Sequence, residues 1–462
     1  MATNTSSDMA NARTNDTICA VSTPAGVGGI AVIRLSGADA KSLAESSLQS
    51  SLGKAVALKN RYAQYAGFIV DGTLLDDVVA TYYAAPHSYT GEDVVEVSCH
   101  GSLYIQQQAL QHFVNNGARL ADAGEFTLRA FLNGRLDLSQ AEAVADLIDS
   151  QSQMAHRLAI SQMRGGYAIE LEQLRQELID TTALLELELD FSEEDLEFAN
   201  RERLKEMIDA LYVRVKTLSD SFKTGNAIKN GIPVTIVGRP NAGKSTLLNA
   251  LLNEDRAIVS DTPGTTRDTI EDSFFSDGIE FRIIDTAGLR DSDDPLEKMG
   301  MERTYKALEK AAIILLLHDS QVPFDEFKDD IDIIANHCPT DKTLLLVHTK
   351  CDLCKPDTDK GVMSAAKKGE GVDEIKRFLV KTVREKMLKD TNVLLANARH
   401  YEAMNKVLAS LDEVKKGIAA NLTPDLLVID MRDALYHLGT ITGSVTSDEV
   451  LSSVFSRFCI GK

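Results

Sequence analysis

The chain has 462 residues, 44% of them hydrophobic, and its 49 basic and 69 acidic side chains give a formal charge of −20. This length corresponds to about three domains, and the negative charge disfavours non-specific attraction to a nucleic acid backbone. No apolar run approaches the roughly 18 residues of a membrane span, and the 6 unevenly spaced cysteines do not resemble a disulfide framework. We therefore expect a soluble, multidomain protein of the reducing cytoplasm.

The N-terminal part of the chain predicts a polar leader followed by an α+β domain. Residues 1–16 lack the apolar core of a secretory signal, so we expect a disordered leader there. Residues 17–130 alternate short β-like runs with turn signals and contain one helical stretch, over 102–115. The β-like runs are 17–23, 29–37, 78–85 and 93–101.

Two later segments, 131–228 and 387–462, have the apolar periodicity of helices, with hydrophobic residues three and four positions apart. Each segment alone offers a half-bundle with an exposed apolar face. Two half-bundles bury these faces better together than apart, which predicts one discontinuous helical domain. We expect this antiparallel bundle to have no chemistry of its own.

Between the helical segments, residues 229–386 alternate strands with helices, the pattern of a doubly wound α/β domain. The sequence therefore predicts a multidomain α+β protein in which this α/β domain is inserted into the helical domain. The strand-like runs are 233–238, 281–285, 312–318 and 343–348.

The segment GRPNAGKS (238–245) follows the first of these runs and precedes a helical stretch, which is the context of a phosphate-binding loop. Its glycines let backbone N–H groups point at phosphate oxygens, Lys244 supplies a positive charge, and the Ser245 hydroxyl can bind Mg²⁺. The predicted GTP ligands of this loop are Asn241, Ala242, Gly243, Lys244, Ser245 and Thr246.

Two further motifs follow in the order that a GTPase requires. GTTRD supplies Thr265 and Thr266, hydroxyls of the kind that close over Mg²⁺ when a γ-phosphate is present. FRIIDTAG ends a strand in Asp285, a carboxylate beside the Mg²⁺ site, and Gly288 leaves room for the γ-phosphate. The predicted GTP ligands here are Ser260, Asp261, Thr262, Pro263, Gly264, Thr265, Thr266, Asp285, Thr286, Ala287 and Gly288, with Ser245 and Thr266 as Mg²⁺ ligands.

The choice of base comes from HTKCD, because Asp352 can accept two hydrogen bonds from guanine's N1–H and amino group. Thr349 stands where most GTPases have Asn, so one amide contact is lost. Cys351 and Cys354 form a C-x-x-C, but no second pair stands at zinc spacing, so a redox or zinc site is disfavoured. The predicted guanine-binding residues are Thr349, Lys350, Asp352, Ser364, Ala365 and Ala366.

Together, GRPNAGKS, GTTRD, DTAGLR and TKCD, with IRLSG and TGEDVVE before them and CIGK at the end, resemble the MnmE (TrmE) family of tRNA-modification GTPases. The resemblance covers nearly the whole chain from Asp16. It implies a homodimer that binds 5-formyl- or 5,10-methylene-tetrahydrofolate and acts with the FAD-dependent MnmG (GidA) in a heterotetrameric or larger complex. The implied reaction adds a carboxymethylaminomethyl or aminomethyl group to carbon 5 of the wobble uridine of certain tRNAs, which bind largely through MnmG.

The resemblance also implies K⁺-activated hydrolysis, in which a cation near the phosphates offsets developing charge alongside Lys244. Leu289 stands where Ras-like enzymes have a water-orienting Gln, and the family's glutamate for that role matches Glu297, with Arg267 and Arg290 as nearby switch residues. The implied K⁺ ligands are Asn241, Ser260, Thr262 and Thr265.

For the folate, the resemblance implies Arg34, Glu96, Arg135 and Lys462 as ligands. A prenylation signal does not fit CIGK, because Lys is an unusual last residue for it and no polybasic run precedes it. The tail instead carries Lys462 and its carboxylate back toward the first domain. Cys459 is then a catalytic candidate beside the reaction centre. Its role is open between nucleophile, proton relay and simple packing beside Phe458, of which packing is the commoner role for such a cysteine.

Two other functional classes remain as alternatives. One is a GTPase switch for ribosome or ribonucleoprotein assembly, without modification chemistry, but it would lack the folate-like domain and CIGK. The other is a redox or metal protein built on Cys351, Cys354 and Cys459, which fits the sequence poorly.

Overall fold

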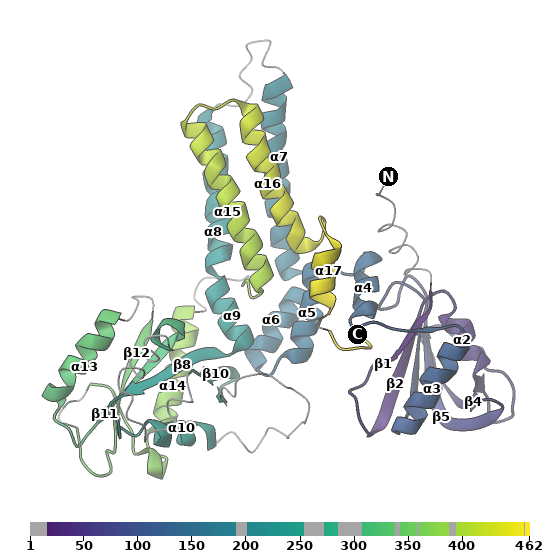
Figure 1. The fold of residues 1–462 in the computed structure, drawn as a ribbon, viewed down its shortest axis with the longest axis horizontal. Helices are drawn as coiled ribbons and strands as arrows, with labels where there is room; N and C mark the ends of the chain where they lie inside the picture. The colour runs from purple at the N-terminus through teal and green to yellow at the C-terminus, as the bar shows by residue number, and fades with distance from the viewer. Residues whose placement is uncertain are drawn as a thin grey trace. The chain divides into compact units, whose positions relative to one another are not determined.

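A computed structural model describes residues 16–190, 201–253, 272–284, 307–337, 342–356, 358, 360–387, 394–456 and 458–462. The chain divides into two compact units, and Figure 1 labels their helices and strands. Unit 1 comprises Met1–Ala145, Gln162–Arg175 and Tyr436–Lys462, and unit 2 comprises Asp146–Ser161 and Gln176–Leu435. Within the described ranges, no helix is both long and apolar enough to span a bilayer.

Unit 1 contains a seven-stranded sheet in the order β3-β4-β5-β6-β2-β1-β7, antiparallel except for the β1–β7 pair. Its strands are β1 (Ile18–Val21), β2 (Gly28–Ser36), β3 (Leu48–Gln49), β4 (Ala63–Val70), β5 (Thr73–Tyr83), β6 (Val94–Gly101) and β7 (Arg119–Leu120). Side chains alternate along each strand, so Ile33 and Val97 are buried with the helices α2 (Ala40–Ser46) and α3 (Leu103–Asn115). Arg34 and Glu96, which lie opposite each other in the β2–β6 ladder, therefore occupy the other face.

The C-terminal segment belongs to unit 1. Helices α4 (Glu125–Leu132), α5 (Leu138–Asp149) and α17 (Asp448–Phe455) contribute to one apolar cluster, in which Leu138, Val454, Phe455 and Phe458 are buried. Gly124, with φ of 70°, permits this approach, because a Cβ there would lie 2.7 Å from the carbonyl oxygen of Phe455. The cluster fixes the start of the CIGK tail.

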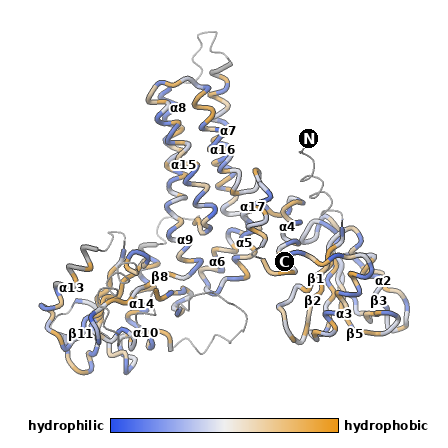
Figure 2. The backbone as a smooth tube through the Cα atoms, viewed as in Figure 1, coloured by the Kyte–Doolittle hydropathy of each residue, from blue (hydrophilic) through white to orange (hydrophobic). Residues whose placement is uncertain are grey.

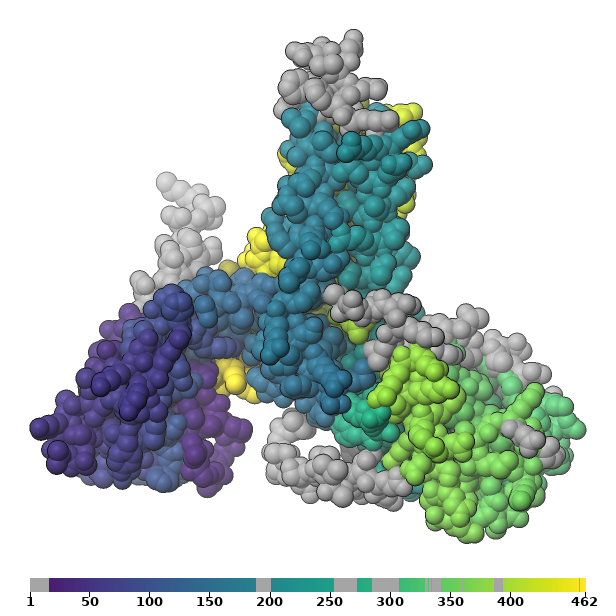
Figure 3. Space-filling model, turned by 180° about the vertical axis from the view of Figure 1, so that it is seen from behind, coloured from purple at the N-terminus to yellow at the C-terminus, as the bar shows by residue number. Residues whose placement is uncertain are grey.

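Two helical segments far apart in sequence pack side by side in unit 2. Ser219 of α8 donates to Asn405 of α15 at 2.9 Å across 186 residues of sequence, and both helices mix apolar and polar residues along their length (Figure 2). Glu177 and Arg214 join α7 to α8, which lie in contact in Figure 3. The helices are α6 (Gln153–Met163), α7 (Gly166–Asp190), α8 (Arg201–Asp220), α9 (Phe222–Asn230), α15 (Ala398–Ala419) and α16 (Pro424–Thr442).

The α/β part of unit 2 has a six-stranded sheet in the order β13-β12-β11-β8-β10-β9, parallel except at β9. The strands are β8 (Ile232–Gly238), β9 (Ser273–Ser276), β10 (Ile279–Ile283), β11 (Ile313–Asp319), β12 (Thr343–Thr349) and β13 (Val362–Met363). The flanking helical elements are α10 (Lys244–Asn253), α13 (Phe324–His337), η2 (Ala366–Lys368), α14 (Val372–Thr382) and η3 (Val383–Met387).

Helices cover both faces of this sheet. On β11, Leu315 packs in the cluster that includes α10 and α14, and Leu316 packs in the cluster that includes Phe327 of α13. The strand is therefore buried on both faces, which explains its continuous apolar run. The predicted organisation, an α+β N-terminal domain, a discontinuous helical part and an inserted doubly wound sheet, is confirmed.

Candidate functional site

The phosphate-loop motif lies between β8 and α10. Asn241 and Gly243 have positive φ angles of 62° and 88°, and α10 begins at Lys244. Such a turn before a helix directs successive N–H groups toward one point, which suits an anion. The Lys244 ammonium donates to the carbonyl oxygens of Gly238 and Arg239, both at 2.9 Å. Burial lowers the pKa of Lys244.

The predicted base-recognition segment begins where β12 ends. The Thr349 hydroxyl lies 2.8 Å from the carbonyl oxygen of Ala242 in the phosphate loop. Lys350 has φ of 56°, and its ammonium binds Asp319 at 2.6 Å. The Asp352 carboxylate lies 3.7 Å from the Lys368 ammonium. The structure thus connects the phosphate loop to the segment that was predicted to bind guanine.

The loop with Ser364, Ala365 and Ala366 lies beside this segment. The Cys351 N–H donates to the Ser364 carbonyl at 3.3 Å, and the Ala365 N–H donates to the Glu370 carbonyl at 3.0 Å, while Ala366 begins η2. Ser364 is buried and its hydroxyl donates to the same Glu370 carbonyl at 3.1 Å. The described part of the predicted guanine site is therefore one hydrogen-bonded assembly.

Sequence reasoning missed a buried pair of histidines, His318 of β11 and His348 of β12, which lies next to Thr349. The Nδ1 atoms of His318 and His348 lie 2.8 Å apart, and their Nε2 atoms face the carbonyl oxygens of Val322 and Lys360 at 2.9 and 2.5 Å. The pair connects the ends of β11 and β12 to the segment that leads into β13. Each histidine stands alone in its own strand, so the sequence offered no signal for the pair.

Many predicted switch residues lie outside the described ranges. They are Ser260, Asp261, Thr262, Pro263, Gly264, Thr265, Thr266, Arg267, Asp285, Thr286, Ala287, Gly288, Leu289, Arg290 and Glu297.

A second cluster, in unit 1, contains three of the four predicted folate ligands. Arg34 donates from Nε and Nη2 to Oε1 of Glu96 at 3.0 and 2.8 Å, and from Nη1 to the Gly461 carbonyl at 3.3 Å. The rings of Tyr89 and Phe126 lie 5.4 and 5.6 Å from its guanidinium carbon. Arg34 is therefore oriented by an ion pair, a carbonyl and two rings.

The tail reaches this cluster through Gly461, which sequence reasoning did not single out. Gly461 has φ of 95°, and a Cβ there would lie 2.3 Å from the Val21 carbonyl oxygen. Its own carbonyl accepts from Ser22 at 3.1 Å. Burial and the nearby charge of Arg34 lower the pKa of Lys462. The glycine in CIGK is the signal that could have predicted this close approach.

The two other predicted residues of unit 1 are placed differently. Arg135 follows α4 and is exposed, and a Cβ built on Gly91 would lie 3.2 Å from its Cγ. Cys459 is exposed although Phe458 beside it is buried. This exposure argues against a packing role for the thiol.

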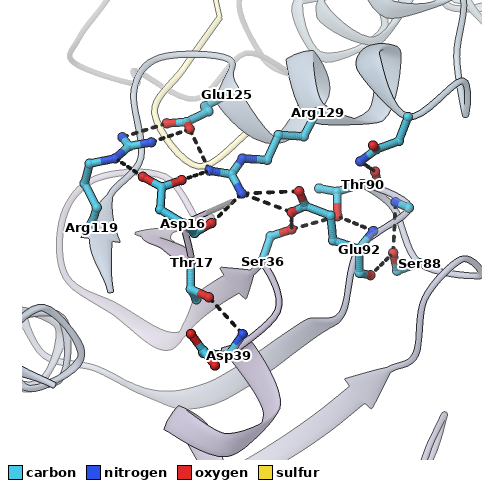
Figure 4. Close-up of polar contacts among 12 residues, drawn as sticks. Asp16, Thr17, Ser36, Asp39, Ser88, Thr90, Glu92, Arg119, Glu125 and Arg129 are labelled. Atoms are coloured by element: carbon cyan, nitrogen blue, oxygen red, sulfur yellow. Dashed lines mark hydrogen bonds and ion pairs between the residues drawn. The ribbon is translucent and has the colours of Figure 1, made fainter. Parts of the chain in front are cut away.

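An ion-pair network fixes the region around β1 and α4 (Figure 4). Arg129 is 2% exposed and binds the carboxylates of Asp16, Glu92 and Glu125 at 2.5, 3.1 and 3.0 Å. Burial alone would raise the pKa values of Asp16 and Glu125, but hydrogen bonds from Arg119 and Arg129 outweigh it and lower both. Helical arginines are usually exposed, so this burial could not be expected from the sequence.

Comparison with known proteins identifies the family. A model described as the GTP-binding protein TrmE N-terminus matches residues 17–135, and a model of the MnmE helical domain matches residues 138–459. A Flavobacterium johnsoniae protein named tRNA modification GTPase MnmE is 48% identical, over 97% of this chain and 99% of that protein. The chain belongs to the MnmE family.

Other MnmE relatives agree in length and identity. A Parabacteroides distasonis protein of the same name is 46% identical over 96% of this chain and all of that protein. Among solved structures, the G domain of the T. maritima FeoB iron transporter is 26% identical, covers 32% of this chain and 97% of that chain, and has a TM-score of 0.24. In this MnmE-family chain the phosphate loop belongs to unit 2 and the Arg34–Gly461 cluster to unit 1.

Proposed function

We propose that this chain is a Mg²⁺-dependent, K⁺-activated GTPase that hydrolyses GTP to GDP and phosphate. With MnmG, it adds a carboxymethylaminomethyl or aminomethyl group to carbon 5 of the wobble uridine of certain tRNAs, using a tetrahydrofolate one-carbon unit. The observation that carries the proposal is the 48% identity, over nearly the whole of both chains, to a protein named tRNA modification GTPase MnmE.

The phosphate loop supports the hydrolytic half of this proposal. The N–H groups of the turn at Asn241 and Gly243 suit the phosphate oxygens, and the Lys244 ammonium is already held over the loop by two carbonyls. Because burial lowers the pKa of Lys244, the protonated form gains from a phosphate partner. Ser245, at the start of α10, would hold Mg²⁺ with Thr266, and Mg²⁺ would neutralise charge on the phosphates.

Hydrolysis also needs groups that orient water and offset charge. We propose Glu297 for the first role, because Leu289 cannot hydrogen-bond water. We propose K⁺ for the second. Its ligands would be Asn241, Ser260, Thr262 and Thr265, of which Asn241 lies in the described turn of the phosphate loop.

The cluster in unit 1 supports a folate site. Oε1 of Glu96 accepts hydrogen bonds from Arg34, and within the described ranges no protein group donates to its Oε2. This second oxygen suits the amino and ring N–H edge of a pterin. The basic side chains of Arg34, Arg135 and Lys462 suit the ligand's carboxylates. The bound folate would supply the one-carbon unit, and we propose the exposed Cys459 as a chemical group at its edge.

The partners follow from the same proposal. We propose a homodimer that assembles with MnmG, and tRNA that binds largely through MnmG, since a formal charge of −20 opposes broad contact with a phosphate backbone. We propose that the reaction takes place in the cytoplasm, where GTP and tRNA are both available.

Reconstitution tests the proposed function. The purified chain should hydrolyse GTP faster in KCl than in NaCl at equal ionic strength. With MnmG, a tetrahydrofolate, GTP, tRNA and glycine or ammonium as the source of the amine nitrogen, it should modify the wobble uridine, and omission of any one of these components should prevent this. Full modification without this chain would contradict the proposal.

A further inference from the structure

Thr349 makes a connection that its position in the sequence does not suggest. It is 4% exposed at the end of β12, and its hydroxyl oxygen lies 2.8 Å from the Ala242 carbonyl and 3.2 Å from the His318 carbonyl. Both neighbours can only accept, so the hydroxyl must be the donor. The shorter contact goes to the phosphate loop, 107 residues away in the sequence.

Close packing accompanies this hydrogen bond. A Cβ built on Gly243 would lie 3.6 Å from Cβ and 3.8 Å from Cγ2 of Thr349. The Thr349 methyl and hydroxyl therefore both lie against the loop residues that precede Lys244. The phosphate loop and the base-recognition segment are therefore in direct contact at Thr349.

We propose that Thr349 is a positioning residue that fixes the phosphate loop against the base-recognition segment and does not read the base itself. A threonine has one O–H hydrogen, and here it is committed to a loop carbonyl. None remains for guanine N7, which is an acceptor. An asparagine at this position would have two N–H donors as well as an acceptor, so it could do both. This inference rests on the proposed binding of guanine nucleotides.

Two measurable consequences follow. Without the hydroxyl, the buried Ala242 carbonyl loses a donor and the loop is less well fixed before nucleotide binds. Part of the ordering must then occur on binding, so we expect about tenfold weaker affinity for GDP and GTP. Because Thr349 donates no hydrogen bond to base N7, replacement of N7 by C–H should have little effect on the affinity of the wild type for the nucleotide.

The experiment titrates the full-length wild type with GDP and 7-deaza-GDP, and titrates three variants with both. Thr349→Val keeps the shape and loses the donor, and we expect about tenfold weaker GDP binding. Thr349→Ser keeps the donor and should stay within about twofold of the wild type. Thr349→Asn should distinguish GDP from 7-deaza-GDP, which the wild type should bind about equally.

Each outcome decides one point. Normal GDP affinity in a folded Thr349→Val variant, even with a lowered melting temperature, would overturn the positioning role. A wild type that strongly prefers GDP to 7-deaza-GDP, with the preference lost in Thr349→Val, would show that Thr349 reads the base. The wild-type comparison needs no variant to fold. A wild type that bound neither nucleotide would instead contradict the proposed function.

Discussion

Substitution of Gly461 by alanine tests whether the C-terminal tail is held against the sheet of unit 1. The new Cβ would meet the Val21 carbonyl at 2.3 Å, and φ of 95° is a conformation that alanine rarely adopts. The conformational cost is about 1–2 kcal/mol. Relief of the clash by moving the tail would break the hydrogen bonds from Ser22 and Arg34 to the Gly461 carbonyl, at about 1 kcal/mol each.

The hydrogen bonds are broken in the undocked state of the wild type as well, so the docking equilibrium shifts by the strain in the docked state, about 1–2 kcal/mol, or roughly a tenfold smaller docked population. Hydrogen exchange of the peptide that contains residues 458–462 measures docking directly, and titration with 5-formyl-tetrahydrofolate measures its effect on the proposed site. Gly53→Ala is the matched control, because Gly53 has φ of 70° but nothing within 4 Å of its Cβ position. Unchanged tail protection and folate affinity in Gly461→Ala would refute the reasoning.

Three further substitutions address chemistry and stability. Glu297→Ala should leave GTP affinity within about twofold while turnover falls at least a hundredfold, measured by single-turnover hydrolysis; unchanged hydrolysis would remove Glu297 from the mechanism. Cys459→Ser should abolish tRNA modification in the reconstituted reaction and keep GTP hydrolysis, and normal modification would exclude a chemical role. Arg129→Met should destabilise unit 1 by about 3 kcal/mol in thermal unfolding, because it leaves the Glu92 carboxylate without its cation and leaves Asp16 and Glu125 paired with Arg119 alone. In the wild type, the pKa values of Asp16 and Glu125 are lowered. The stability that these carboxylates contribute should therefore be complete above their ordinary pKa values and should be lost as pH falls through the lowered pKa values. An equally large loss of stability at low pH in Arg129→Met would contradict a role for Arg129 in lowering them.

The predictability of this molecule differed between its local and its long-range features. The apolar run of β11 and the glycine-containing turn before Lys244 are local patterns, so the sequence indicated a doubly wound sheet with a phosphate loop. The resemblance pointed to Arg34 and Glu96 as ligands, but their mutual ion pair depends on the register of β2 and β6.

Other features depend on contacts that no local pattern encodes. The hydrogen bond from Thr349 to Ala242 crosses 107 residues, so the sequence suggested a lost contact with the base where the structure has a connection to the phosphate loop. The burial of Arg129 required three carboxylates brought together by folding. Cys459 and Phe458 are adjacent, yet one is exposed and the other buried, which sequence proximity could not distinguish.

The most direct test of the proposed function is mass spectrometry of nucleosides from the tRNA of cells that lack this chain. We predict loss of the aminomethyl-type modification at carbon 5 of the wobble uridine, restored by the wild-type gene but not by Lys244→Ala. Wobble uridine that remained fully modified in cells lacking the chain would contradict the account.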